Sequence, residues 1–80
     1  MPERLQIYVR HGCHLCDDML VALETVKTRW SFELEVIDIG GNEAFEASYG
    51  TRVPLLKSEH AEICYYFLDE EALQAYFSRS

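Results

Sequence analysis

The sequence predicts an α/β domain with the element order β-α-β-α-β-β-α, and three observations carry this prediction. Apolar runs of strand length and composition occupy residues 5–9, 32–39, 51–57 and 62–67. Apolar residues recur at helical spacing in residues 13–29, 43–49 and 70–78. Glycine, proline and polar turn residues separate these segments, as at Gly40-Gly41 and residues 58–61. The pattern therefore favours a sheet with helices packed on it.

In chain order, the strand over 5–9, the helix over 13–29 and the strand over 32–39 predict a right-handed βαβ unit with parallel strands. In residues 13–29 one helix face is apolar, and acidic residues near the start and basic residues near the end suit the helix dipole. The strand over 32–39 carries Glu33 and Glu35, which is typical of a strand at the edge of a sheet.

The second half predicts a short helix, a hairpin and a last helix. Asn42 is placed to cap the helix over 43–49, because its side chain can accept hydrogen bonds from the first free N–H groups. Asp69 is placed in the same way at the helix over 70–78. The expected apolar face of that last helix consists of Leu73, Tyr76 and Phe77.

Length and charge limit the possible functions. Eighty residues are expected to form a single domain, 1–80. The net charge of −7 argues against nucleic acid or an anionic membrane as partner, since both require a basic patch. Residues 1–4 lead into the first strand without the apolar core of a signal peptide, so we expect a cytoplasmic protein. Three cysteines suit a reactive pair and a spare better than a disulfide framework.

Cys13 and Cys16 lie where the first strand ends and the first helix begins. The first cysteine then faces the unpaired N–H groups and the positive dipole end of the helix. These donors stabilise a thiolate over a thiol, which makes a cysteine nucleophilic at neutral pH. Cys-x-x-Cys in this setting is typical of a redox-active site. We expect Cys13 to be the nucleophile and Cys16 the resolving thiol.

With these residues the chain resembles a glutaredoxin, the small branch of the thioredoxin fold, over nearly all of its length. The resemblance is carried by Arg10-x-x-Cys13-x-x-Cys16 after the first strand and by Val53-Pro54 at the start of the third. In particular, the chain resembles glutaredoxin-like proteins with a Cys-His-Leu-Cys site. This resemblance implies a thioredoxin-like, glutaredoxin-type fold, with a four-stranded mixed sheet and helices on both of its faces.

The resemblance also implies a function, thiol–disulfide oxidoreduction in cell redox homeostasis, through the Cys13/Cys16 dithiol. Arg10 would then stabilise the thiolate, and Val53 would offer its backbone to an extended thiol substrate beside a cis Pro54. Independently of the resemblance, a protonated His14 near the thiolate would make the disulfide more oxidising.

No tightly bound cofactor is expected, and glutathione is a possible external reductant. The expected substrate is a disulfide-containing protein or a small thiol compound, and the chain is expected to act as a monomer.

One departure from the glutaredoxin pattern supports an alternative. Glutaredoxins have a Gly-Gly turn and an acidic residue after the fourth strand, which grip glutathione. Here the same place reads Tyr65-Tyr66-Phe67-Leu68-Asp69. We expect these aromatics to pack in the core and on the sheet edge, with one of them possible as a cover for the substrate groove. The alternative function is a thioredoxin-fold binding or adaptor module with redox-sensing or vestigial cysteines and no turnover.

Metal sites are a further alternative. Cys13, Cys16, His60 and Cys64 form a conceivable zinc set, but the 43 residues between Cys16 and His60 make an unusually long linker. Cys64 is expected to be a small buried apolar residue of a strand. An iron–sulfur cluster shared by two subunits occurs in some glutaredoxins, usually those with a single active-site cysteine. No metal site is therefore predicted.

Overall fold

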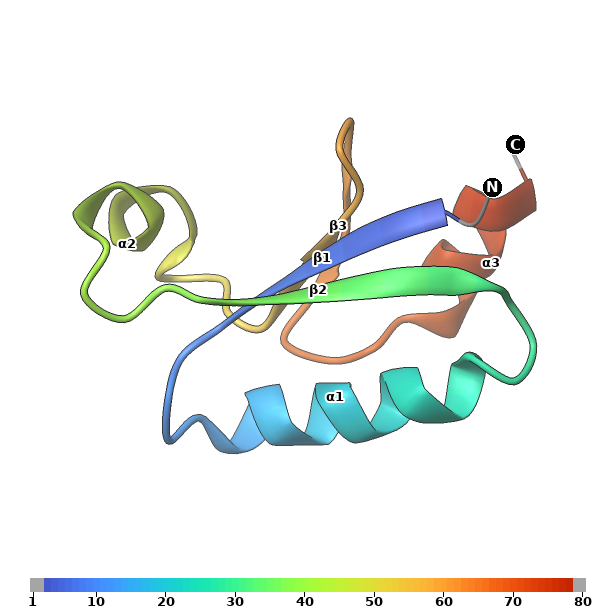
Figure 1. Cartoon of the computed structure of the whole chain (residues 1–80), viewed down its shortest axis with the longest axis horizontal. Helices are drawn as coiled ribbons and strands as arrows, with labels where there is room; N and C mark the ends of the chain where they lie inside the picture. The colour runs from blue at the N-terminus through green and yellow to red at the C-terminus, as the bar shows by residue number, and fades with distance from the viewer. Residues whose placement is uncertain (1–2, 79–80) are drawn as a thin grey trace.

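The predicted order of elements is confirmed. The computed structural model describes residues 3–78 (Figure 1). The predicted domain, 1–80, extends two residues beyond that range at each end. The elements are β1 (Glu3–Val9), α1 (His14–Val26), β2 (Phe32–Asp38), α2 (Glu43–Tyr49), β3 (Leu55–Lys57), β4 (Glu62–Tyr65) and α3 (Glu70–Ser78).

The sheet is mixed, with the strand order β2-β1-β3-β4. β1 pairs in parallel with β2 over their full length, and β3 pairs antiparallel with both β1 and β4. The first two strands and α1 thus form the expected βαβ unit. β2 is an edge strand, as predicted from Glu33 and Glu35. Both side chains are exposed, so their charges stay in water.

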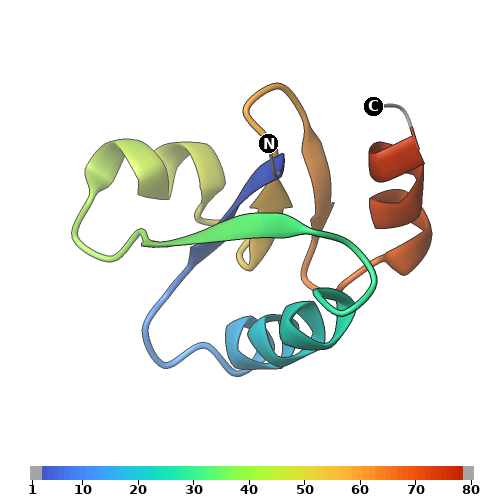
Figure 2. The ribbon, with the colours of Figure 1, turned by 45° about the vertical axis from the view of Figure 1, so that its right-hand side comes forward.

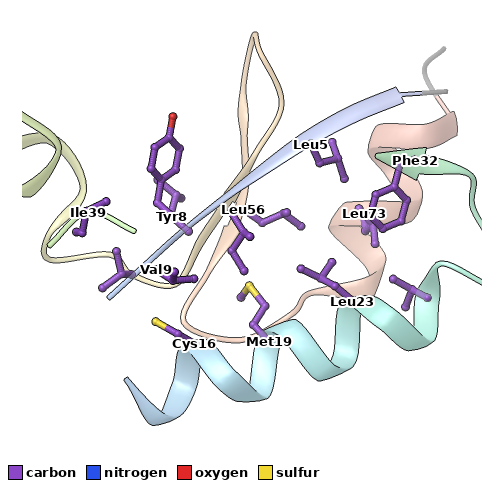
Figure 3. Close-up of a cluster of buried hydrophobic side chains, with 14 residues drawn as sticks. Leu5, Tyr8, Val9, Cys16, Met19, Leu23, Phe32, Ile39, Leu56 and Leu73 are labelled. Atoms are coloured by element: carbon purple, nitrogen blue, oxygen red, sulfur yellow. The ribbon is translucent and has the colours of Figure 1, made fainter. Parts of the chain in front are cut away.

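Helices cover both faces of the sheet, with α1 and α2 on opposite sides (Figures 1 and 2). The alternation along β1 explains this arrangement. Leu5 and Ile7 are fully buried, while the neighbouring Tyr8 stacks on Tyr49 of α2 with ring centroids 4.4 Å apart. Figure 3 shows Tyr8 pointing away from α1, on the other side of the sheet from Leu5. The short helix α2 is therefore held to the sheet by aromatic packing.

The main core lies between the sheet, α1 and α3. Leu23 of α1, Leu73 of α3 and Leu56 of β3 are all fully buried (Figure 3). At one end of this core Trp30 stacks on Phe77 of α3, with centroids 5.5 Å apart. Such packing is the main source of stability in a domain this small.

The boundaries of α1 differ from the predicted 13–29. The helix begins one residue later because Cys13 is its N-cap, with an extended backbone (φ −91°, ψ 113°). It ends at Val26, because Thr28 and Arg29 donate to carbonyls three residues back and so form tight turns. With 13 residues, α1 is the longest helix in residues 3–78. No helix in this range is long and apolar enough to cross a membrane.

The third and fourth strands are shorter than predicted. The strand predicted over 51–57 begins at Leu55, because the Arg52 N–H donates to the Tyr49 carbonyl in a turn and Pro54 has no N–H for a ladder. The strand predicted over 62–67 ends at Tyr65, because Tyr66 takes a left-handed backbone (φ +69°). Compared with the predicted strands, β1 begins two residues earlier, at Glu3, and β2 ends one residue earlier, at Asp38.

The predicted caps and turn are confirmed. Asn42 Oδ1 accepts from the Phe45 N–H at 3.0 Å, and Asp69 Oδ1 accepts from the Ala72 N–H at 3.0 Å. In the hairpin turn, the buried hydroxyl of Ser58 accepts from the backbone of His60 and Ala61. Local side-chain chemistry thus sets these three element boundaries.

Candidate functional site: a cysteine pair at the start of α1

Cys13 Sγ occupies the N-cap acceptor position of α1. The Cys16 N–H donates to it at 3.1 Å, in the place where a serine or aspartate oxygen usually stands. The approach to this position is a turn in which the Cys13 N–H donates to the Arg10 carbonyl and Gly12 has φ +76°. Only glycine adopts that φ at little cost. The sulfur is therefore held where hydrogen bonding and the helix dipole favour a negative charge.

Cys13 and Cys16 form a disulfide, with their Cα atoms 5.2 Å apart. Cys13 is half-buried, whereas the Cys16 side chain is 2% exposed and belongs to the core below Val9 (Figure 3). A molecule from solvent can therefore reach Cys13 far more easily than Cys16. This asymmetry suits a nucleophile and a resolving thiol.

The two residues predicted to stabilise the thiolate differ in their surroundings. The Arg10 guanidinium pairs with the Glu46 carboxylate of α2 and donates to the Gly50 carbonyl at 3.3 Å. His14 is exposed, and its Nε2 lies 3.4 Å from Asp18 Oδ2. Arg10 thus joins the start of the turn before Cys13 to the end of α2. The predicted roles of Arg10 and His14 toward the thiolate stay predictions.

Val53 and Pro54 are buried and joined by a cis peptide bond, as predicted. Val53 belongs to the same apolar cluster as Cys16, and Cys13 packs against that cluster. The Pro54 carbonyl accepts from the Tyr66 N–H at 2.8 Å. This segment is thereby tied to the residues that follow β4.

The aromatic residues at the end of β4 and just after it are not core residues, so the predicted core packing was wrong. Tyr65 does lie on an edge strand of the sheet, and the predicted cover of a substrate groove stays a prediction. Tyr65, Tyr66 and Phe67 are 50%, 39% and 68% exposed. They leave the core because the left-handed turn at Tyr66 ends the strand, and because Leu55 and Leu56 already fill the interior beside it. The available signal was that these three aromatics and Leu68 lead directly into the acidic start of the last helix.

Cys64 is the free cysteine, half-buried on β4. Burial raises the pKa of its thiol, so it stays protonated at neutral pH. In residues 3–78, no group of three or more His, Cys, Asp or Glu side chains is placed to hold a metal ion. The zinc set with His60 and Cys64 is therefore not brought together.

Comparison with known proteins identifies relatives over nearly the whole chain. The family described as glutaredoxin-like domain (DUF836) matches residues 4–78. A Nitrosomonas europaea protein solved by NMR is 44% identical, with a TM-score of 0.85 over 95% of this chain and 92% of its own. An X-ray structure from X. campestris is 30% identical, with a TM-score of 0.76 over 95% of this chain and 97% of its own.

More distant similarities agree with this result. An uncharacterized protein of Mycobacterium tuberculosis is 27% identical over 96% of this chain and 84% of its own length. Thioredoxin 1 of Thermosipho africanus, at 19% identity, has a TM-score of 0.63 over 95% of this chain and 96% of its own, which shows a shared fold. The chain has the thioredoxin fold, carries its cysteine pair at a CxxC-type site, and belongs to the glutaredoxin-like domain family.

Proposed function

We propose that this protein is a thiol–disulfide oxidoreductase that uses Cys13 and Cys16. The observation that carries the proposal is the position of Cys13 Sγ, which is half-buried, bonded to Cys16 and accepts a hydrogen bond from the Cys16 N–H in the first turn of α1. A sulfur in this position is a good leaving group and, once reduced, a good nucleophile.

The proposed reaction starts from the reduced pair. The Cys13 thiolate attacks one sulfur of a substrate disulfide, so a mixed disulfide forms and the other substrate sulfur leaves as a thiolate. Cys16 then loses its proton and attacks Cys13 Sγ, which restores the Cys13–Cys16 bond and releases the second substrate thiolate. The substrate gains two electrons and, after protonation, two protons.

An external thiol must then reduce the pair again. Two equivalents of a monothiol, or one of a dithiol, supply the two electrons and become a disulfide. Glutathione is the monothiol that we propose, and the setting that we propose is the cytoplasm, where thiols are kept reduced. We further propose a monomer acting on a disulfide-containing protein or small compound, with Val53 presenting its backbone to the extended substrate.

The proposal predicts a depressed pKa for the Cys13 thiol of the reduced protein. We expect half-maximal alkylation by iodoacetamide well below the value for free cysteine, about 8.5, because the N-cap donors favour the thiolate. The measurement is the alkylation rate against pH, with Cys13 adducts identified by mass spectrometry and Cys64 as the internal reference. A Cys13 value at or above 8.5 would instead favour an adaptor without turnover.

The pairing of Arg10 with Glu46 gives a second prediction. Glu46→Gln removes the carboxylate that neutralises the guanidinium, so the positive charge near the active-site turn is no longer balanced. We expect the alkylation rate of Cys13 at pH 7 to rise about two- to threefold, since a nearby positive charge favours a thiolate. The matched control is Glu43→Gln, an exposed residue of the same helix. Equal alkylation rates in the wild type and both variants would contradict a role for Arg10 in stabilising the Cys13 thiolate.

A further inference from the structure

The end of β4 and the loop that follows it present apolar side chains to solvent. We call residues 65–68 the aromatic segment. Phe67 is 68% exposed, while Tyr65 and Tyr66 pack against each other at right angles with centroids 4.9 Å apart. Large exposed apolar patches on a small protein typically mark interaction sites.

This segment is bonded to the loop that carries Pro54. The Tyr66 N–H donates to the Pro54 carbonyl at 2.8 Å, and the Tyr66 hydroxyl donates to the Thr51 carbonyl. Tyr66 holds a φ of +69°, a left-handed conformation that non-glycine residues seldom adopt. An exposed tyrosine kept in a strained conformation points to a role for its side chain beyond folding.

Two clefts lie on either side of Phe67 and Leu68, and both have acidic walls. The cleft against α1, about 240 Å³ in volume, has Met19 and Ala22 in its apolar lining and the carboxylates of Asp18 and Glu70 at its edge. The other cleft is lined by Tyr65 and Phe67 together with the carboxylate residues Asp69, Glu70 and Glu71.

The charges at these clefts are predominantly negative. Neither cleft has a Lys or Arg in its lining, among the residues that the structure describes. Glu70 pairs with Arg29 from outside the lining, and Asp18 lies near His14. Asp69 and Glu71 add two further carboxylates beside Phe67. A cation with an apolar stem fits this combination of apolar floor and acidic wall, which describes a lysine or arginine side chain.

We propose that the aromatic segment docks a polypeptide whose target disulfide is flanked by apolar and cationic side chains. The proposal rests on the proposed oxidoreductase function and names its substrate class. An apolar side chain of the substrate packs on Phe67, and a neighbouring lysine or arginine enters the cleft between Leu68 and Asp18. Glutathione, which carries two carboxylates and one ammonium group, is an anion and finds no cation in these clefts. As the external reductant that we propose, it would therefore reach the Cys13–Cys16 disulfide without docking on the aromatic segment.

Two cyclic peptides of equal length, each closed by one disulfide, test this proposal. One carries Lys-Leu beside each cysteine and the other carries Glu-Leu. At low ionic strength we expect the reduced protein to react about tenfold faster with the Lys-Leu peptide, and the ratio to fall as salt is added. Oxidised glutathione serves as the small anionic substrate, and bis(2-hydroxyethyl) disulfide as the small neutral one.

The variant Phe67→Ser separates docking from chemistry. We expect it to react about tenfold more slowly with the Lys-Leu peptide, since aromatic anchors dominate such interfaces. Its rate with the neutral small disulfide should stay within about twofold of the wild type. The matched control is Val21→Ser on α1, because Val21 is 69% exposed but lines neither cleft. It should change neither rate.

The outcomes distinguish the two proposals. Docking is overturned if both peptides react at the same rate at low salt, or if Phe67→Ser slows the neutral small disulfide as much as the peptide. If the wild type reduces no disulfide, the proposed function fails, and docking is decided by NMR. The Lys-Leu peptide with serines in place of cysteines must then shift the amide signals of Phe67 and Leu68, and without such shifts docking is also rejected.

Discussion

Replacing Cys13 by serine is expected to lower the rate of disulfide reduction by about 10³-fold or more, because a serine hydroxyl does not ionise at neutral pH and cannot form a mixed disulfide. Cys16 cannot replace it, because its side chain is 2% exposed and packs in the core. The measurement is the turnover of bis(2-hydroxyethyl) disulfide with an external thiol in excess.

Two further cysteine variants serve as controls for this result. Cys64→Ser should keep the wild-type rate, because Cys64 lies on β4 outside the disulfide. Cys16→Ser, incubated with the disulfide in the absence of external thiol, should accumulate a mixed disulfide at Cys13, visible as an added mass, because the resolving thiol is missing. Full turnover by Cys13→Ser would contradict the mechanism.

The second large effect concerns stability. Leu23→Ala is expected to lower the free energy of unfolding by about 2–5 kcal/mol, because it leaves a cavity between α1 and the sheet. Leu23 is fully buried, and an 80-residue domain has on the order of 4–12 kcal/mol in total. Urea unfolding measured by circular dichroism should therefore show a midpoint at much lower urea concentration, or a protein that is largely unfolded without urea.

Val21→Ala is the matched control for the core substitution. Val21 lies two residues away on the same helix and is 69% exposed, so its truncation should change stability by no more than about 0.5 kcal/mol. A loss as large as that of Leu23→Ala would contradict burial as the cause, because alanine also has the higher helix propensity and so cannot weaken α1 by that route.

The elements were predictable because their signals are local. Helical spacing placed α1 and α3, and the caps at Asn42 and Asp69 depend on an N–H only three residues away. The cysteine site was predictable for the same reason, since Cys13 and Cys16 need only the start of one helix to come together. The end of α1 was predicted three residues too late, because the tight turns after Val26 share the apolar pattern of a regular helix.

The sequence by itself therefore determined the order of strands and helices and the position of the sulfur pair, because both follow from interactions within a few residues. The tertiary structure alone decided the pairing of Arg10 with Glu46, which are 36 positions apart, and the exposure of Phe67. Both depend on which surfaces the rest of the chain already covers. Leu55 and Leu56 fill the interior beside β4, so the aromatics at its end and just after it are left facing solvent.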